Sequence, residues 1–210
     1  MHHRHTLALK MSGLAVVLSV LALAVVPPSM AASPPEPTYG TANVDGLTNE
    51  WVLVSDFFAN MHRAGKEDKP IESKLYLRYD CVTGTMYVLV LTEPGIPAIV
   101  NNNTAWVAID NQNNKVVLGI SGDDGFPPDF AWVAIAYDGD ATHARGYEAS
   151  FNILPGTYEI ITHVNVFDAA NQQTSATIGF PGNGPDLRIV CGVVPVKQTT
   201  WSQIKGVMPR

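Results

Sequence analysis

Residues 73–81, SKLYLRYDC, and residues 85–92, TMYVLVLT, are the stretch that decides the fold. From Leu75 to Cys81 the odd-numbered positions are apolar or aromatic and the even-numbered positions are mostly polar, which is typical of a strand with one face in water. The second run is apolar on both faces, so we expect a central strand. Thr83-Gly84 supplies a turn between the two runs, and together they predict a β-hairpin.

Short β-rich runs separated by turn residues continue along the rest of the chain. Residues 105–110 (AWVAID) and 115–120 (KVVLGI) predict a second hairpin, because the four Asn and Gln residues between them tolerate left-handed turn geometry. Further strands are expected at residues 129–137, 146–153, 157–167, 173–180 and 186–191. No long amphipathic helix is indicated, and the best helical candidate is a short piece around residues 56–65. About eight to ten short strands predict an all-β, antiparallel β-sandwich, with a barrel as the alternative.

The first 31 residues have the pattern of a signal peptide. Arg4 and Lys10 precede an apolar run from Leu14 to Val26, and small residues in Ser29-Met30-Ala31 suit signal peptidase. The apolar run, of about 13 residues, is too short to cross roughly 30 Å of hydrocarbon as a stable span. We therefore expect a secreted protein, extracellular or periplasmic; an uncleaved membrane anchor is the alternative.

The remaining chain divides into three parts by composition. Residues 32–43 are rich in proline and small residues and are expected to be a flexible leader. Residues 44–191 contain the predicted strands and form the expected β-sandwich domain. Residues 192–210 are a basic C-terminal tail in which Trp201, Ile204 and Met208 share helical spacing. This tail is either a short amphipathic docking segment or a disordered end.

The two cysteines indicate the redox compartment of the protein, and its net charge limits the classes of partner that it can bind. Cys81 and Cys191 both lie in the part expected to be exported, so a disulfide bond is predicted, with two free thiols as the alternative. Without residues 1–31, which contain two basic residues and no acidic one, the formal net charge is −8. Nucleic acid and anionic membranes are poor partners for such a surface, whereas a glycan, a cation or an extracellular protein remains open.

Four segments together resemble family 9 carbohydrate-binding modules and their DOMON-like relatives. These segments are 44–51 (VDGLTNEW), 75–80 (LYLRYD), 86–90 (MYVLV) and 105–110 (AWVAID), and the resemblance covers about residues 44–137. It implies a jelly-roll-like β-sandwich that is usually non-catalytic. Some members of the family hold the end of a glycan between two tryptophans, some bind calcium, and some DOMON-like members hold haem or sugar.

Trp106 and Trp132 are the candidate sugar platforms, because the C–H edges of a sugar ring pack on aromatic faces. Asn102 and Asp123 lie in nearby polar loops and are expected to bind the sugar hydroxyls. The alternative is that both tryptophans belong to the core, since their strands are strongly apolar. Trp51 is expected in the core, under the Asp-Gly turn.

No cofactor is expected, although calcium is a candidate. Asp123-Asp124 with Asp129, or Asp138-Gly139-Asp140, offers carboxylates in loops, but neither segment has the spacing of an EF-hand. Solvated acidic turns are the alternative interpretation. The histidines beyond the signal peptide lack metal-binding spacing.

Catalytic motifs are absent from the sequence. Gly119-Ile120-Ser121-Gly122 lacks the spacing of a nucleophile elbow, and no glycine-rich phosphate loop follows a strand. Glu148 and Glu159 are the remaining candidates for a glycosidase pair. The sequence therefore predicts a secreted, non-catalytic binding module with carbohydrate as the leading ligand class. A structural or cell-surface interaction protein that uses the sandwich as a scaffold is the alternative.

Overall fold

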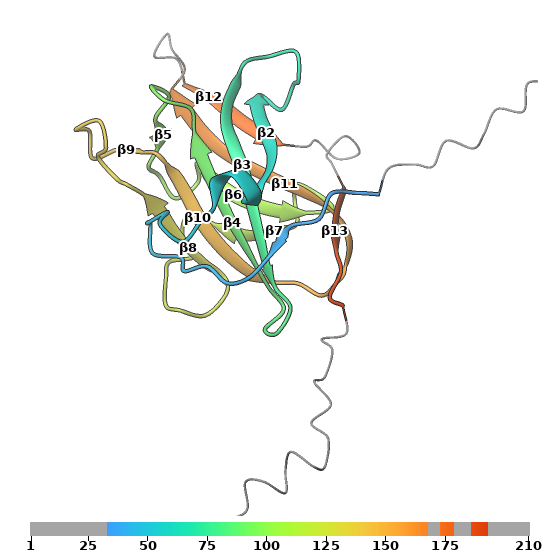
Figure 1. Ribbon diagram of the computed structural model, residues 1–210. Helices are drawn as coiled ribbons and strands as arrows, with labels where there is room; N and C mark the ends of the chain where they lie inside the picture. The colour runs from blue at the N-terminus through green and yellow to red at the C-terminus, as the bar shows by residue number, and fades with distance from the viewer. Residues whose placement is uncertain (1–32, 168–172, 179–185, 193–210) are drawn as a thin grey trace, which may run out of the picture. The chain divides into compact units, whose positions relative to one another are not determined.

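A computed structural model describes residues 33–167, 173–178 and 186–192 of this chain (Figure 1). The predicted signal peptide and all of the C-terminal tail beyond Gly192 lie outside these residues. The described part contains one short helix and thirteen strands. These are β1 (Thr38–Tyr39), α1 (Leu53–Asp56), β2 (Phe57–Arg63), β3 (Ile71–Asp80), β4 (Thr85–Thr92), β5 (Ala98–Ile99), β6 (Ala105–Ile109), β7 (Lys115–Leu118), β8 (Asp129–Val133), β9 (His143–Ala144), β10 (Gly146–Asn152), β11 (Gly156–Phe167), β12 (Gln173–Ile178) and β13 (Asp186–Ile189).

The strands form the predicted all-β, sandwich-like fold. The main sheet runs β7-β6-β11-β12-β2-β3-β4-β10-β8, and its neighbouring strands are antiparallel. The two ends of this order, β7 and β8, contact each other, so the sheet folds over on itself. Figure 1 shows the result, with β3, β4 and β10 in front of β6 and β11. β13 adds an antiparallel strand to the start of β11, from Gly156 to Glu159, in a second, smaller sheet.

Both predicted hairpins and the disulfide bond are confirmed. β3 pairs with β4 from Ser73↔Thr92 to Asp80↔Thr85, and β6 pairs with β7. β4 lies between β3 and β10 and is buried along nearly its whole length, as its apolar sequence predicts. Cys81 and Cys191 are bonded, with 5.6 Å between their Cα atoms, which ties the β3–β4 turn to the end of β13. A disulfide is compatible with an extracellular location. Among the described residues, no helix is long and apolar enough to cross a membrane.

The main core lies between the two halves of the folded sheet. Leu75, Leu77 and Tyr79 of β3 pack there, together with alternate residues of β4, β6, β10 and β11. The other face of β3 is not in water, which corrects the prediction of one solvated face. Tyr76 is buried in a second, smaller core with Trp51 and residues of β4 and β8. This face of β3 is buried because another segment of the chain covers it, which the alternation of β3 alone does not reveal.

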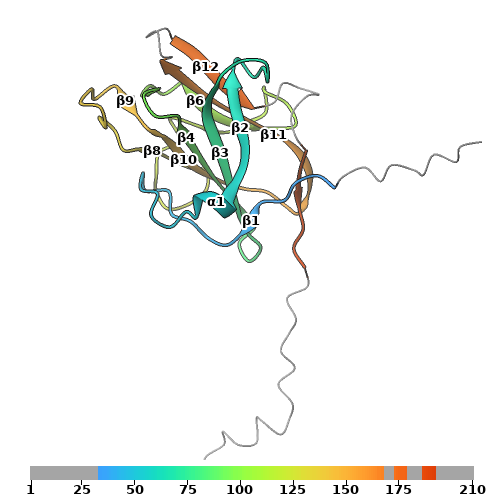
Figure 2. The same ribbon diagram turned by 45° about the horizontal axis from the view of Figure 1, so that its top comes forward.

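This covering segment comprises residues 38–56, and we call it the strap. It begins with β1, which pairs in parallel with β3, and it ends with α1 (Figure 2). Ala42 and Trp51 of the strap are buried against the sheet. Residues 32–43 were expected to be a flexible leader, and the structure differs from this expectation at residues 38–42. Pairing with the β3 edge and burial of Ala42 order that part of the chain.

The prediction of a short helix around residues 56–65 is wrong. Apart from Asp56, the last residue of α1, this stretch is strand β2 and a turn after it, and β2 pairs with β3 on one side and β12 on the other. Met61 is fully buried in the main core. The open edges of two neighbouring strands thus determine the structure here, and tertiary pairing overrides a weak local preference.

Candidate functional site

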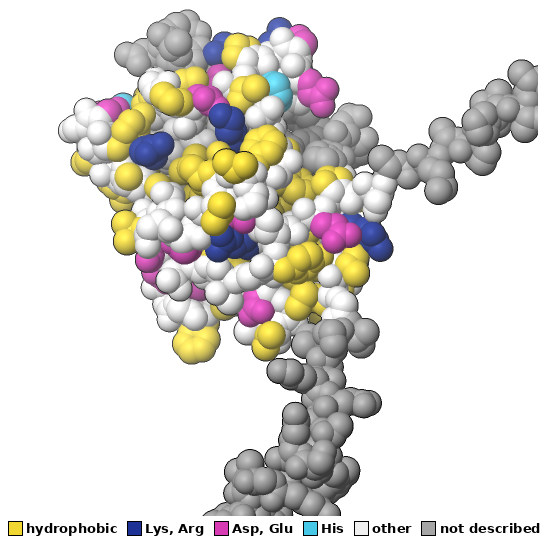
Figure 3. Space-filling view, viewed as in Figure 1, with side chains coloured by type: hydrophobic (Ala, Val, Ile, Leu, Met, Phe, Trp, Pro, Cys, Tyr) yellow, Lys and Arg dark blue, Asp and Glu magenta, His cyan; other side chains and the backbone are white. Residues whose placement is uncertain are grey.

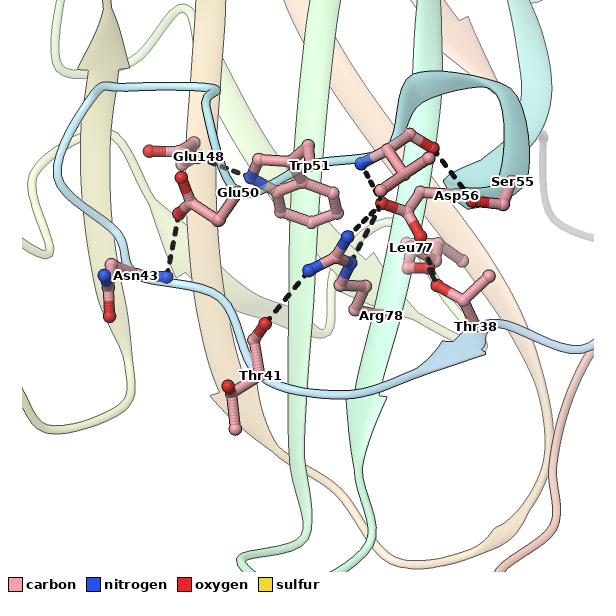
Figure 4. A network of polar contacts seen from close by, with 11 residues as sticks. Thr38, Thr41, Asn43, Glu50, Trp51, Ser55, Asp56, Leu77, Arg78 and Glu148 are labelled. Carbon is pink, nitrogen blue, oxygen red and sulfur yellow. Dashed lines mark hydrogen bonds and ion pairs between the residues drawn. The ribbon is translucent and has the colours of Figure 1, made fainter.

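The strap is held to the sheet by a buried carboxylate. Glu148 of β10 has an exposed fraction of 0%. Its Oε2 accepts hydrogen bonds from the backbone N–H groups of Gly46 (2.8 Å) and Asp45 (3.2 Å), and its Oε1 accepts one from the indole N–H of Trp51 (2.7 Å). Figure 4 shows the indole of Trp51 directed at this carboxylate. A Cβ on Gly46 would lie 2.6 Å from the carbonyl oxygen of Trp132, so the tight turn here requires glycine.

The environment of Glu148 favours its neutral form. Burial raises the pKa of Glu148 to about 7, and the hydrogen bonds from Trp51, Gly46 and Asp45 only partly oppose this rise. The neighbouring carboxylate of Glu50 adds to it. Arg78 lies over the ring of Trp51 with its Cζ 5.4 Å from the ring centroid, and its guanidinium pairs with a different carboxylate, that of Asp56.

Asp56 provides the second attachment of the strap. Its Oδ2 lies 2.7 Å from Nη2 of Arg78 and accepts the backbone N–H of Val52 at 2.7 Å. Its Oδ1 accepts the hydroxyl of Thr38 at 2.6 Å (Figure 4). Burial alone would raise the pKa of Asp56, but the hydrogen bonds from Arg78, Thr38 and Val52 outweigh it and hold the pKa below its usual value. The two carboxylates therefore fix both halves of the strap.

A cleft of about 630 Å³ lies beside residues 42–45 of the strap. Its walls come from the strap, β4, β10 and the segment that leads into β8. The cleft contains two aromatic rings, Tyr87 and Phe126, and three carboxylates, Asp45, Asp123 and Asp129. None of the described residues that line it is Lys, Arg or His. It is therefore rich in hydrogen-bond acceptors, acidic, and partly apolar.

The side chains of the cleft differ in how firmly they are held. Asp129 is buried, and its carboxylate accepts the backbone N–H of Asp124 and the hydroxyl of Ser150, both at 3.3 Å. Burial raises the pKa of Tyr87, and the charge of Asp129 is one of the smaller causes. Phe126 has an exposed fraction of 77%, and its ring is thus available to a ligand. The cleft combines a fixed polar floor with an accessible aromatic side chain.

Asp123 is the only one of the four predicted binding residues that lines the cleft. Trp106 and Trp132 do not line it. Trp132 packs against the main core, edge-on to Phe130 with 5.1 Å between ring centroids. Trp106 is carried on the opposite face of β6 from the core residues of that strand. Asn102 is exposed in the loop between β5 and β6.

Trp106 has partners of its own on the sheet surface. The ring of His163 stacks on it with 4.9 Å between centroids, and Nζ of Lys115 lies 4.7 Å from the ring centroid. Burial lowers the pKa of His163 and therefore favours its neutral form. Trp106 is therefore half-buried. It lies outside the main core, and the side chains of His163 and Lys115 lie against its ring.

Sequence reasoning did not propose five residues of the cleft as binding residues: Asp45, Tyr87, Phe126, Ser150 and Asn152. Tyr87 is the polar-tipped residue in the otherwise apolar interior of TMYVLVLT, and this is the one sequence signal that marked it. Asp45 stands in a turn and Asn152 at the end of β10, where polar residues are common. Phe126 lies in the segment before β8 and Ser150 within β10, and no sequence pattern marks either of them.

The acidic segments considered for calcium hydrogen-bond to their own neighbours. Among the described residues, no three His, Cys, Asp or Glu side chains come together to hold a metal ion. Asp138 instead lies 2.6 Å from Nδ1 of His143, and this hydrogen bond lowers the pKa of Asp138. Asp124 accepts the backbone N–H of Phe126, which is the usual role of an acidic side chain in a turn.

The carboxylate pair considered for glycoside cleavage is also separated. Glu148 lies on β10, which pairs with β4 and β8, whereas Glu159 lies on β11, which pairs with β5, β6, β12 and β13. Glu148 is enclosed under the strap, and Glu159 stands opposite Asp186 in the small sheet. The two side chains belong to different regions of the fold.

No protein-family model matches this chain. A search of curated proteins found none with significant sequence similarity. The cleft and its chemistry are therefore the basis on which a function is proposed.

Proposed function

We propose that the protein is a secreted, non-catalytic module that binds a neutral carbohydrate in the cleft beside the strap. The observation that carries the proposal is the composition of the cleft, in which two aromatic rings and three carboxylates meet without a cationic side chain. Its volume of about 630 Å³ suits a small ligand or one or more sugar units.

The chemistry of a sugar matches these groups. A sugar presents hydroxyl donors around its edge and C–H groups on its faces. Carboxylates accept hydroxyl hydrogen bonds strongly, because charge-assisted bonds are the stronger ones. The exposed ring of Phe126 offers the apolar face. Phosphorylated and other anionic ligands are disfavoured, since three carboxylates would repel them.

Secretion is part of the same proposal. The Cys81–Cys191 disulfide and the signal-peptide pattern of residues 1–31 support export into an oxidising compartment. The resemblance of the strap sequence to the start of family 9 carbohydrate-binding modules also supports a binding role.

A glycan array with and without added calcium tests the proposal, followed by calorimetry on the best neutral glycan. Phe126→Ala is expected to weaken binding about tenfold or more, which is about 1.4 kcal/mol. Ile120→Ala is the matched control, because Ile120 is also largely exposed but does not line the cleft. Asp123→Asn should weaken binding as well. The absence of neutral-glycan binding, or equal losses in both alanine variants, would refute the proposed site, and release of shorter sugars would refute the non-catalytic role.

A structural or cell-surface role is the second candidate, and one observation favours it. Val52, Leu53, Val54 and Phe57 are all exposed, although they are apolar, and they follow each other through α1 into β2. Figure 3 shows apolar side chains gathered on the face where α1 lies. Exposed apolar patches of this kind often mark interaction surfaces. Val54→Glu would then reduce association in sedimentation experiments and leave glycan binding unchanged.

A further inference from the structure

We infer that the binding site extends past the β3–β4 turn into a second cavity, so that the ligand is a carbohydrate chain held along several units. This inference rests on the proposed function and adds the length and mode of binding of the ligand. A site confined to one cavity would instead take a single sugar or the end of a chain.

The second cavity has a volume of about 510 Å³ and adjoins the cleft. It is lined by Thr83, Gly84, Asn152, Ile153, Leu154 and Tyr158. Thr83 and Asn152 also line the cleft, so the two cavities meet at these two side chains. Each cavity alone is within the range of about 300–1,000 Å³ that is usual for small-ligand sites.

The boundary between the cavities is polar and can bind a ligand that crosses it. Oδ1 of Asn152 accepts a hydrogen bond from the hydroxyl of Thr85 at 3.2 Å. The Nδ2 amide group of Asn152 has no partner among the described residues, and Asn152 is exposed. Two N–H donors therefore remain at the boundary for the hydroxyl or ring oxygens of a sugar.

The second cavity repeats the chemistry of the first with less charge. Leu154 has an exposed fraction of 76% and supplies an apolar surface. The hydroxyl of Tyr158 donates to the carbonyl oxygen of Leu154 at 3.0 Å and so fixes the aromatic ring beside it. None of the described residues that line this cavity carries a charge. A neutral chain can thus extend from the acidic cleft into a cavity whose lining is uncharged.

The turn between the cavities is rigidly held. The backbone N–H of Gly84 donates to the carbonyl of Asp80, and the N–H of Ile153 donates to the carbonyl of Gly84, both at 2.9 Å. Cys81, at the start of the turn, is covalently bonded to Cys191. A binding surface that is already ordered loses less entropy when a ligand binds, which favours recognition of an extended chain.

A length series of neutral oligosaccharides tests the inference. Disaccharides to hexasaccharides of β-linked glucose, xylose, mannose and galactose are titrated by calorimetry against the wild-type protein and two variants. The affinity of the best series is expected to rise about tenfold or more with chain length. Leu154→Ala should lower the affinity for the hexasaccharide several-fold and leave that for the disaccharide unchanged. Leu47→Ala is the matched control, because Leu47 is largely exposed on the strap and lines neither cavity.

The outcomes separate the inference from the proposed function. Binding of short sugars that is lost in Phe126→Ala, with no gain from longer chains, retains the proposed function and overturns the extended site. Equal effects of Leu154→Ala on short and long chains overturn it as well. Failure of all the sugars at every length overturns both.

Discussion

The buried carboxylate of Glu148 makes the stability of the fold depend on pH, and Glu148→Gln tests this directly. Glutamine keeps the size of the side chain but has no acidic proton. In the folded protein the pKa of Glu148 is raised from 4.5 to about 7. Between these pH values the folded state retains a proton that the unfolded state has lost, so the contribution of Glu148 is fully present below about pH 4.5 and decreases as the pH rises toward 7.

The magnitude follows from the rise in pKa. At about 1.4 kcal/mol per pKa unit, full deprotonation of Glu148 in place costs about 3 kcal/mol of folding free energy. The side chain is fully buried, so solvent does not screen this cost. Near pH 4 we expect Glu148→Gln to be less stable than wild type by about 1 kcal/mol, because the amide satisfies fewer of the three N–H donors. Near pH 8 the order is expected to reverse, because the variant avoids the cost of about 3 kcal/mol.

Urea unfolding followed by tryptophan fluorescence at a series of pH values measures this difference. Glu67→Gln is the control, because it removes one carboxylate from the exposed turn between β2 and β3 and should change stability by less than about 0.5 kcal/mol. A constant difference between wild type and Glu148→Gln from about pH 4 to pH 8 would refute the raised pKa. A wild type that gains stability with pH relative to the variant would mean that the three N–H donors outweigh burial.

Three further predictions concern the frame of the site. Replacing Cys81 and Cys191 by serine removes a crosslink between residues that are 110 positions apart in the sequence. The free energy of unfolding should fall by about 2–4 kcal/mol, measured by urea unfolding of the oxidised wild type and the double variant. Trp51→Phe keeps an aromatic ring but removes the donor to Glu148, and a loss of about 1–3 kcal/mol in the same assay is expected; an unchanged midpoint would contradict the role of that bond. Gly146→Ala would place a Cβ against the carbonyl of Val90 at a φ of 147°, so a loss of about 3 kcal/mol or more is expected in thermal melts followed by circular dichroism.

The sequence predicts most of the longer strands well because their signals are local, and β2 is the exception. Alternation in β3 and continuous apolar character in β4 each require only neighbouring positions. The strand expected at 129–137 is shorter, since β8 ends at Val133 and Ala134 and Ala136 adopt positive φ angles. Alanine has no intrinsic preference for such a conformation, and no sequence pattern announces it.

The cleft was not predictable in the same way, because its parts are distant in the sequence. The strap contributes Asp45, the middle of the chain contributes Tyr87 and Phe126, and β10 contributes Asn152. Their meeting depends on the strap crossing the outer face of β4 and β10. Trp106 and Trp132, the two tryptophans that the sequence suggests as a sugar platform, are carried by β6 and β8 to different surroundings.

The Asp45-Gly46 turn, Trp51 and Glu148 require one another. The donors on the strap are separated from Glu148 by 103, 102 and 97 residues. An apolar side chain at position 148 would pack against Trp51 but would leave the buried N–H groups of Gly46 and Trp51 without acceptors, at a cost of about 1–3 kcal/mol each. The part-buried N–H of Asp45 would lose its acceptor as well. A carboxylate has two oxygens that together accept all three bonds, and an amide has one oxygen for the same task. The energetic cost of burying Glu148 is thus a consequence of holding the strap by its backbone, and the same backbone places Asp45 in the wall of the cleft.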